Sequence, residues 1–290
     1  MGFHASMFKS IQPKVFSFDV EWTPDPMAAE ILTGVKQDPP HSLPAAFRSL
    51  WDYGGADEEN PQPYIKTILC RVVSIAGILR EVTGGGTPDL KLISLPSNPS
   101  DPERANEKTV LQAFFKAVGR SRPQIVGYNS SNADVPILMQ RAIVHGLSGF
   151  GFGRRPDKPW EGVDYFVQGG DFHVDLAGIL GRYKNTPSLH EAASLSGIPG
   201  KIEMSGDSVG EMWLQGKLQE IVNYNEFDAF TTHLLWARMA RFADLLTGEQ
   251  YEQEQVLVRE LLELEINAGR THLQTFLDEW DRLKEINQRG

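Results

Sequence analysis

The first residues that could do chemistry are two carboxylates in an apolar segment near the start of the chain, Asp19 and Glu21 in KVFSFDVEW. In a β-strand, residues two apart share a face, so both acids would point away from the face that carries Phe16 and Phe18. Burying an unpaired carboxylate costs roughly several kcal/mol, and a divalent cation that prefers oxygen ligands removes this cost. The pair therefore indicates either a metal site or a strand end that is exposed to solvent.

Two more acidic residues lie far along the chain, at positions that a helix would define. Asp134 comes two residues before Pro136, and proline is accepted only in the first turn of a helix, so Asp134 lies at or near a helix N-terminus. Tyr224 and Asp228 are four residues apart and share one face of a helix, which is mainly apolar, so Asp228 points inward. Taken singly, Asp134 could complement the helix dipole, and Asp228 could be a hydrogen-bonded structural residue.

The elements that must position these acids can be predicted from the hydrophobic pattern. Strands rich in β-branched residues are expected at 14–22, 68–82, 90–95 and 124–128. Amphipathic helices are expected at 103–119, 135–145 and 251–286. The stretch 23–63 is interpreted as an insertion with a short helix at 43–51, and three glycines at 84–86 as a hairpin turn. This order favours an α/β fold, with a mixed sheet flanked by helices.

Together and in this order, the acids resemble the three exonuclease motifs of the DEDD superfamily: Asp-x-Glu on a first strand, Asn-x4-Asp entering a helix and Tyr-x3-Asp on a late helix. The tyrosine of the third motif is typical of the DEDDy branch. More narrowly, the chain is similar, over residues 14–290, to stand-alone 3′→5′ exonucleases related to the proofreading domain of family B DNA polymerases. The phrases HVDLAGIL, SLSGIPGK and MSGDSV support this similarity. Two positions depart from the pattern, because Ala133 replaces the usual aromatic residue and Asn225 a frequent cysteine.

The resemblance implies a ribonuclease-H-like fold with a five-stranded mixed sheet. It implies an exonuclease domain over residues 1–240 and a helical C-terminal extension over 241–290 that packs on the same domain. The implied activity is metal-dependent hydrolysis of phosphodiester bonds at nucleic-acid 3′ ends, with single-stranded DNA favoured as the substrate, in proofreading or DNA repair.

The resemblance also implies roles for the individual acids. Two Mg²⁺ or Mn²⁺ ions would balance the charge of the four carboxylates and act on the attacking and leaving oxygens. Asp19 would bridge both ions, Glu21 and Asp228 would complete the first site, and Asp134 would hold the second ion. Tyr224 would orient the attacking water as a neutral hydrogen-bond partner, because the ordinary pKa of a tyrosine is near 10.

Substrate contacts are predicted from basic, polar and aromatic residues. A loop that contains Arg154, Arg155 and Trp160 suits phosphate contact and base stacking, or is a solvated loop with an anchoring tryptophan. Lys201 in GIPGK lacks the surrounding residues of a nucleotide-binding loop and is either a phosphate contact or a surface lysine. The other predicted substrate contacts flank the acids: Val20, Trp22 and Asn129.

Composition narrows the alternatives. The 290 residues carry a net charge of −10, which argues against a protein that coats nucleic acid through a broad basic surface. The single cysteine, Cys70, excludes an internal disulfide. With no apolar run long enough to span a bilayer and no visible secretory signal, we expect a cytoplasmic protein, monomeric rather than oligomeric through its terminal helices. A ribonuclease acting on RNA 3′ ends and a non-catalytic nucleic-acid-binding relative are the alternative functions.

Overall fold

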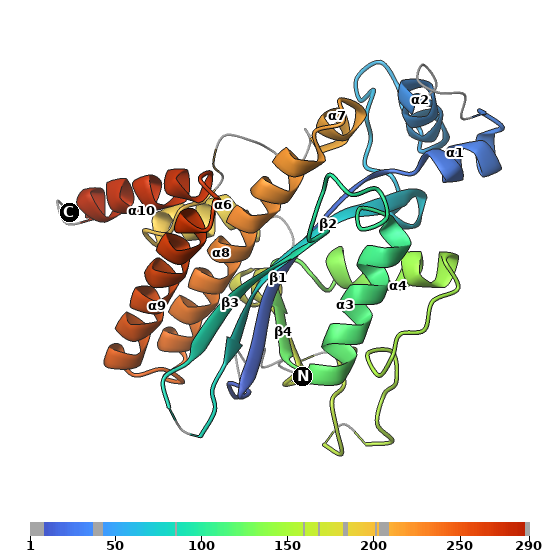
Figure 1. The fold of residues 1–290 in the computed structure, drawn as a ribbon. Helices are drawn as coiled ribbons and strands as arrows, with labels where there is room; N and C mark the ends of the chain where they lie inside the picture. The colour runs from blue at the N-terminus through green and yellow to red at the C-terminus, as the bar shows by residue number, and fades with distance from the viewer. Residues whose placement is uncertain are drawn as a thin grey trace.

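The structure is a computed structural model that describes residues 9–36, 43–84, 86–158, 160–167, 169–181, 185–200, 202 and 209–287. Its centre is a five-stranded sheet in the order β3-β2-β1-β4-β5 (Figure 1). The strands are β1 (Lys14–Pro24), β2 (Cys70–Glu81), β3 (Asp89–Leu95), β4 (Gln124–Gly127) and β5 (His173–Asp175). Strand β2 runs antiparallel to both of its neighbours, whereas β1, β4 and β5 are parallel. This mixed five-stranded order is the ribonuclease-H-like α/β fold predicted from the sequence.

Helices cover both faces of the sheet (Figure 1). On one face lie α3 (Glu107–Ser121) and α4 (Asp134–Val144), and on the other lie α8 (Leu218–Phe242), α9 (Gly248–Asn267) and α10 (Leu273–Asn287). Strand β1 is buried on both sides, as the central strand of such a sheet must be. Phe16 and Phe18 pack in the core with α3 and α4, whereas Val15 packs in the core with α8.

The terminal helices bury their apolar side chains against the body of the protein. Leu262 and Phe276 are fully buried and share a core with Phe230 and Trp236 of α8. The expected helical segment at 251–286 is two helices, separated at Gly269, whose positive φ of 110° suits glycine. The apolar side chains of α9 and α10, which could also have formed oligomer contacts, are thus buried within the protein itself. The domain boundary at residue 240 stays a prediction.

The insertion after β1 contains more structure than the sequence predicts. Helix α2 (Leu43–Tyr53) is found where a short helix is expected, but α1 (Pro26–Thr33) was not predicted. The side chain of Asp25 accepts a hydrogen bond from Met27 N at 3.1 Å, and Pro26 occupies the start of the helix. An aspartate followed by a proline is an ordinary helix start, and this signal was overlooked within TPDP.

Short elements complete the chain. A 3₁₀ turn, η1 (Thr67–Leu69), leads into β2. The described residues between β5 and α8 include the short helices α5 (Leu176–Leu180), α6 (Leu189–Leu195) and α7 (Val209–Leu214). Among the described residues, no helix combines the length and the apolar character that crossing a membrane requires.

Candidate active site

The first two carboxylates lie in the middle of β1, on the face turned toward α8. Ser17, on the same face, has its Oγ 3.0 Å from Nδ1 of His233 in α8. Phe18 belongs to the core on the opposite face. Because Asp19 and Glu21 follow Ser17 in steps of two, they also face α8. The strand thus has the apolar and acidic faces that the sequence predicts.

Helix α8 brings a third carboxylate to this pair. Asp19, Glu21 and Asp228 each offer one oxygen, and these oxygens all lie within 4.8 Å of one another. Tyr224, one turn earlier on α8, forms a hydrogen bond with Asp228 and is buried. Further along the same helix, the fully buried Trp236 anchors α8 to the core. Packing of the helix therefore sets the position of Asp228 and Tyr224 relative to β1.

The fourth acid comes from the start of α4. Asp134 is the first residue of this helix and is 3% exposed. Its Oδ1 accepts a hydrogen bond of 3.1 Å from the main-chain N–H of Val20, the residue between Asp19 and Glu21. The main chain of the acidic strand therefore holds Asp134 directly. The sequence-distant acids are thus brought to one place by β1, α4 and α8.

Burial and mutual repulsion act on these acids. Burial raises the pKa of Asp19 well above its usual value, and the charges of the neighbouring acids raise it further. Burial and the charges of Asp228 and Asp134 likewise raise the pKa of Glu21. Burial raises the pKa of Asp134 to about 7, although hydrogen bonds from main-chain N–H groups oppose this shift. No cationic side chain of the described residues is among the causes of these shifts, so this part of the chain supplies no balancing charge.

The donor set fits an oxygen-preferring divalent cation. Three carboxylate oxygens already lie within 4.8 Å of one another, and Mg²⁺ and Mn²⁺ take oxygen ligands of this kind. Ionised, buried carboxylates without a counter-ion are strongly unfavourable. A bound dication would remove this penalty, and Asp134 lies beside the group.

The sequence of residues 62–280 matches a family described as a predicted 3′-5′ exonuclease related to the exonuclease domain of PolB. The chain belongs to this family. The match includes Asp134, Tyr224 and Asp228 but begins after Asp19 and Glu21. Asp19 and Glu21 lie outside the matched residues of this exonuclease family member, and they are placed beside the other acids by the fold.

Other comparisons are more distant. No curated protein sequence matches the chain. The family B DNA polymerase from the hyperthermophilic archaeon Pyrobaculum calidifontis is similar in structure, with a TM-score of 0.41 and 17% sequence identity over 86% of this chain. The chain spans 29% of the length of that polymerase chain.

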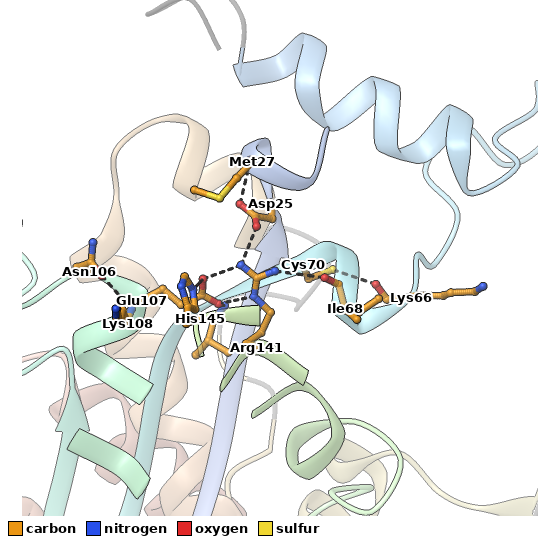
Figure 2. A network of polar contacts seen from close by, with 11 residues as sticks. Asp25, Met27, Lys66, Ile68, Cys70, Asn106, Glu107, Lys108, Arg141 and His145 are labelled. Carbon is orange, nitrogen blue, oxygen red and sulfur yellow. Dashed lines mark hydrogen bonds and ion pairs between the residues drawn. The ribbon is translucent and has the colours of Figure 1, made fainter. Parts of the chain in front are cut away.

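A buried arginine, which the sequence analysis missed, connects helix α4 to the neighbouring strand and helix that carry or border the acids (Figure 2). Arg141 lies two turns after Asp134 on α4. Its Nη2 is 2.7 Å from Asp25 Oδ2 at the end of β1 and 2.8 Å from Glu107 Oε2 at the start of α3, and its Nη1 donates to Ile68 O at 3.2 Å. Arg141 therefore ties the helix that carries Asp134 to the strand that carries the first two acids. A helix pattern alone gives no signal for such a contact.

The predicted substrate contacts near the acids differ in their exposure. The side chain of Val20 is buried in the core, and its N–H is used by Asp134. Trp22 is half-buried against the same core. Asn129, with a positive φ of 58°, is exposed and lines a pocket of about 490 Å³ that also contains Asn132. Of the three predicted contacts, Asn129 is the one whose side chain faces open space.

The basic loop before β5 lies around the start of β4, at the end of that strand away from Asp134. Tyr165 Oη in this loop donates to the carbonyl of Pro123, the residue before β4. Arg155 is paired with the buried Asp164, at 3.0 Å. Arg154 is exposed, and so is Trp160 at 79%. The structure therefore does not bring these residues together with the acids. Lys201 lies outside the described residues.

Two further residues, Asp175 and Tyr64, lie near Asp134. The carboxylate of Asp175, at the end of β5, accepts a hydrogen bond from Ser131 N at 3.0 Å and is one of the charges that raise the pKa of Asp134. Tyr64 is 73% exposed, and the charge of Asp134 is among the causes that raise its pKa, after burial and Cys70. Both residues are near Asp134 only because of the fold, and their local sequence contains no sign of it.

Proposed function

We propose that this protein is a metal-dependent 3′→5′ exonuclease that hydrolyses the phosphodiester bond at a nucleic-acid 3′ end. The observation that carries the proposal is the meeting of Asp19, Glu21 and Asp228 from two distant elements, with Asp134 fastened to the strand between the first two. No described cationic side chain acts on Asp19, Glu21 or Asp134, and gathering like charges in this way is unfavourable for a purely structural purpose. Membership in a family of predicted exonucleases supports the same function.

Four carboxylates would hold two divalent cations, Mg²⁺ or Mn²⁺. Asp19, Glu21 and Asp228 form the closest group, and Asp134 would serve the second ion. When bound, the cations supply Lewis-acid activation of water and charge stabilisation at the scissile phosphate. The charge of −4 on the side chains matches two dications, so the loaded site is neutral before the phosphate arrives.

Tyr224 has a different role from the acids. Burial, followed by the charges of the nearby acids, raises the pKa of its hydroxyl, which also bonds to Asp228. The hydroxyl therefore stays protonated at neutral pH and cannot be a strong base. In the proposed reaction, Tyr224 orients the attacking water and Asp228 fixes the orientation of the tyrosine.

The substrate proposed is a single-stranded DNA 3′ end. The pocket that Asn129 lines lies directly after β4, at the turn that leads to Asp134, and its volume of about 490 Å³ offers room for part of a terminal nucleotide. Asn129 is therefore the best-placed of the predicted substrate contacts. We further propose a cytoplasmic monomer that acts in proofreading or DNA repair.

The test removes one carboxylate at a time. Asp19→Ala and Asp228→Ala should lower the rate of mononucleotide release by at least about a thousandfold, because metal binding contributes several kcal/mol to the transition state. Circular dichroism should show that both variants fold. The exposed Asp278 on α10 offers a matched control, since Asp278→Ala should retain the full rate. Near-normal release of mononucleotides by both site variants would overturn the proposal.

The substrate is tested with matched single- and double-stranded DNA and RNA, labelled at either end, in Mg²⁺, Mn²⁺ or chelator. A 3′→5′ exonuclease releases the 3′ label as a mononucleotide and shortens the 5′-labelled strand stepwise. Faster digestion of RNA than of DNA would replace the proposed substrate by RNA. Binding without digestion in either metal would make the protein a non-catalytic relative.

A further inference from the structure

Arg71 is a cationic side chain that follows the acidic pair along the sheet. Strand β1 pairs with β2 so that Thr23, two residues beyond Glu21, stands opposite Arg71. Thr23 continues the alternation of Asp19 and Glu21 on the face toward α7 and α8. Two residues of a strand span about 6.6 Å. Arg71 therefore projects from the sheet about two residues further along β1 than Glu21.

The Arg71 guanidinium is held in a fixed orientation. It lies over the ring of Trp213 from α7, with 5.2 Å between the guanidinium carbon and the ring centroid. Trp213 in turn stacks on Phe47 of α2 at 5.7 Å and 12°. Helix α7 packs directly on β1, because a Cβ built on Gly210 would be in ordinary van der Waals contact with Thr23 Oγ1, at 3.5 Å. An arginine whose flat face is stacked keeps its N–H edge for acceptors.

The N–H groups of the Arg71 guanidinium have no anionic partner among the described residues. The Nε of Arg71 is enclosed and meets no acceptor, and no described carboxylate forms an ion pair with the guanidinium. Two well-buried arginines of the described residues behave differently, because Arg80 pairs with Glu254 and Arg141 with Asp25 and Glu107. Arg71 is half-buried. In a chain with a net charge of −10, an arginine fixed in place without a carboxylate partner among the described residues is available to an anion from outside.

We infer that Arg71, stacked on Trp213, binds a backbone phosphate of the substrate strand. This phosphate is a neighbour of the scissile phosphate and not the scissile phosphate itself. The planar fork of an arginine matches two oxygens of one phosphate. Its place beyond Glu21 puts this contact along the path of a strand whose 3′ end lies at the acids. The inference rests on the proposed exonuclease function and assigns a phosphate contact on β2, away from the basic loop before β5.

The first test counts phosphate contacts. Binding of a short single-stranded DNA is measured by fluorescence anisotropy from about 50 to 200 mM salt, in the hydrolysis-deficient Asp228→Asn background. Each phosphate contact to a single strand contributes about −0.7 to the slope of log K against log salt. Arg71→Ala should weaken binding about tenfold at low salt and reduce the slope by about 0.7. Arg71→Lys keeps the charge, so it should retain the slope while binding more weakly than wild type.

The matched control is Arg48→Ala, which removes the same charge from the exposed face of α2, one residue from Phe47. Its slope should equal that of the parent protein. An unchanged slope in Arg71→Ala, or an equal loss in Arg48→Ala, overturns the phosphate contact.

The second test separates binding from damage to the active site. The p-nitrophenyl ester of thymidine 5′-monophosphate contains only the scissile phosphate, whereas an oligonucleotide contains others. In the wild-type background, Arg71→Ala should lower kcat/KM about tenfold on the oligonucleotide and leave the rate on the small ester unchanged. Equal losses on both substrates would mean that Arg71 only maintains the structure. Absence of hydrolysis by the unmodified protein would contradict the exonuclease function instead, and the salt slopes would still decide the fate of the phosphate contact.

Discussion

Helix α4 takes part in two buried acidic clusters that are built in opposite ways. Its first residue, Asp134, joins the cluster of Asp19, Glu21 and Asp228, where no described side chain supplies a positive charge. Two turns later, Arg141 lies between the carboxylates of Asp25 and Glu107, within 2.8 Å of both (Figure 2). Asp19 and Asp228 of the first cluster are half-buried, whereas Asp25 and Glu107 are buried, and among the described residues only the second cluster contains its own cation.

The pKa shifts follow this difference. Burial tends to raise the pKa of Glu107, but hydrogen bonds from Arg141, His145 and the Val72 N–H, together with the charge of Arg141, bring it below its usual value. At the other end of the helix, burial and neighbouring acids raise the pKa of Asp19, and burial raises that of Asp134 to about 7. Arg141 therefore favours the ionised form of Glu107, whereas burial opposes the ionisation of Asp19 and Asp134. The described residues thus provide a cation for Asp25 and Glu107 but none for Asp19 and Glu21, whose charges a cation from solution would balance.

The largest effect is expected at the compensated cluster. Arg141→Met should lower the free energy of unfolding by about 3–5 kcal/mol, because it leaves Asp25 and Glu107 buried without their cation. Urea denaturation measures this change. Arg104→Met removes an exposed arginine paired at the surface with Asp101 and should change stability by less than about 1 kcal/mol. A loss below about 1 kcal/mol for Arg141→Met would mean that the two clusters do not differ as proposed.

The pH dependence of stability should have opposite signs at the two clusters. The folded metal-free protein keeps a proton on Asp134 up to about pH 7, whereas the unfolded chain loses it near 3.8. Unfolding therefore releases a proton in this window, and the metal-free protein should lose roughly a few kcal/mol of stability as pH rises from about 4 to about 7. Glu107, with its lowered pKa, contributes stability that is lost only as pH falls below the usual range.

Thermal denaturation in chelator at several pH values tests this sign. Asp134→Asn should flatten the change between pH 4 and 7, because its side chain does not titrate. Saturating Mg²⁺ should remove the trend in the wild type, since the cation favours the ionised carboxylates. A metal-free protein that becomes steadily more stable from pH 4 to 7 would contradict the raised pKa values.

Binding of a divalent cation should stabilise the folded protein through the cluster of Asp19, Glu21 and Asp228, by slightly less than the loss expected for Arg141→Met. A ligand that binds only the folded state stabilises it by about 2.7 kcal/mol at one hundred times its Kd. Mn²⁺ or Mg²⁺ should therefore raise the melting temperature of the wild type at pH 8, and this rise should be largely lost in Asp19→Asn. Glu265→Gln, which alters a carboxylate paired with Arg270, is the control and should keep the rise. No metal-induced shift in the wild type would count against a metal site.

The sequence predicted the elements that carry the site because their patterns are local. The two faces of β1 follow from its alternation, and the placement of Tyr224 and Asp228 on one face of α8 follows from their spacing. The parallel pairing of β1 with β4, which lets Asp134 reach Val20 N, follows from the fold family rather than from any local pattern.

What the sequence did not predict depends on contacts between distant segments. Arg141 reaches residues 116 and 34 positions away in the chain, and no helical periodicity indicates either partner. The composition of the loop with Arg155 and Trp160 predicts a nucleic-acid contact. In the structure, Arg155 forms an ion pair with Asp164, and the loop lies beside the start of β4. Composition identifies a loop that could bind phosphate, and only the fold decides whether such a loop lies near the acids.

The smallest expected effect tests the one neutral member of the uncompensated cluster. Tyr224→Phe removes a hydroxyl that bonds to Asp228 but takes away no charge, so we expect the exonuclease rate to fall by about tenfold, the equivalent of one hydrogen bond. Because the raised pKa keeps this hydroxyl protonated, the pH–rate profile should have the same shape with and without it up to about pH 9. Tyr53→Phe, at an exposed position on α2, should leave the rate unchanged. A loss as large as that of Asp228→Ala, or a profile whose basic limb disappears in the variant, would make Tyr224 a proton acceptor in the reaction rather than a guide for the water.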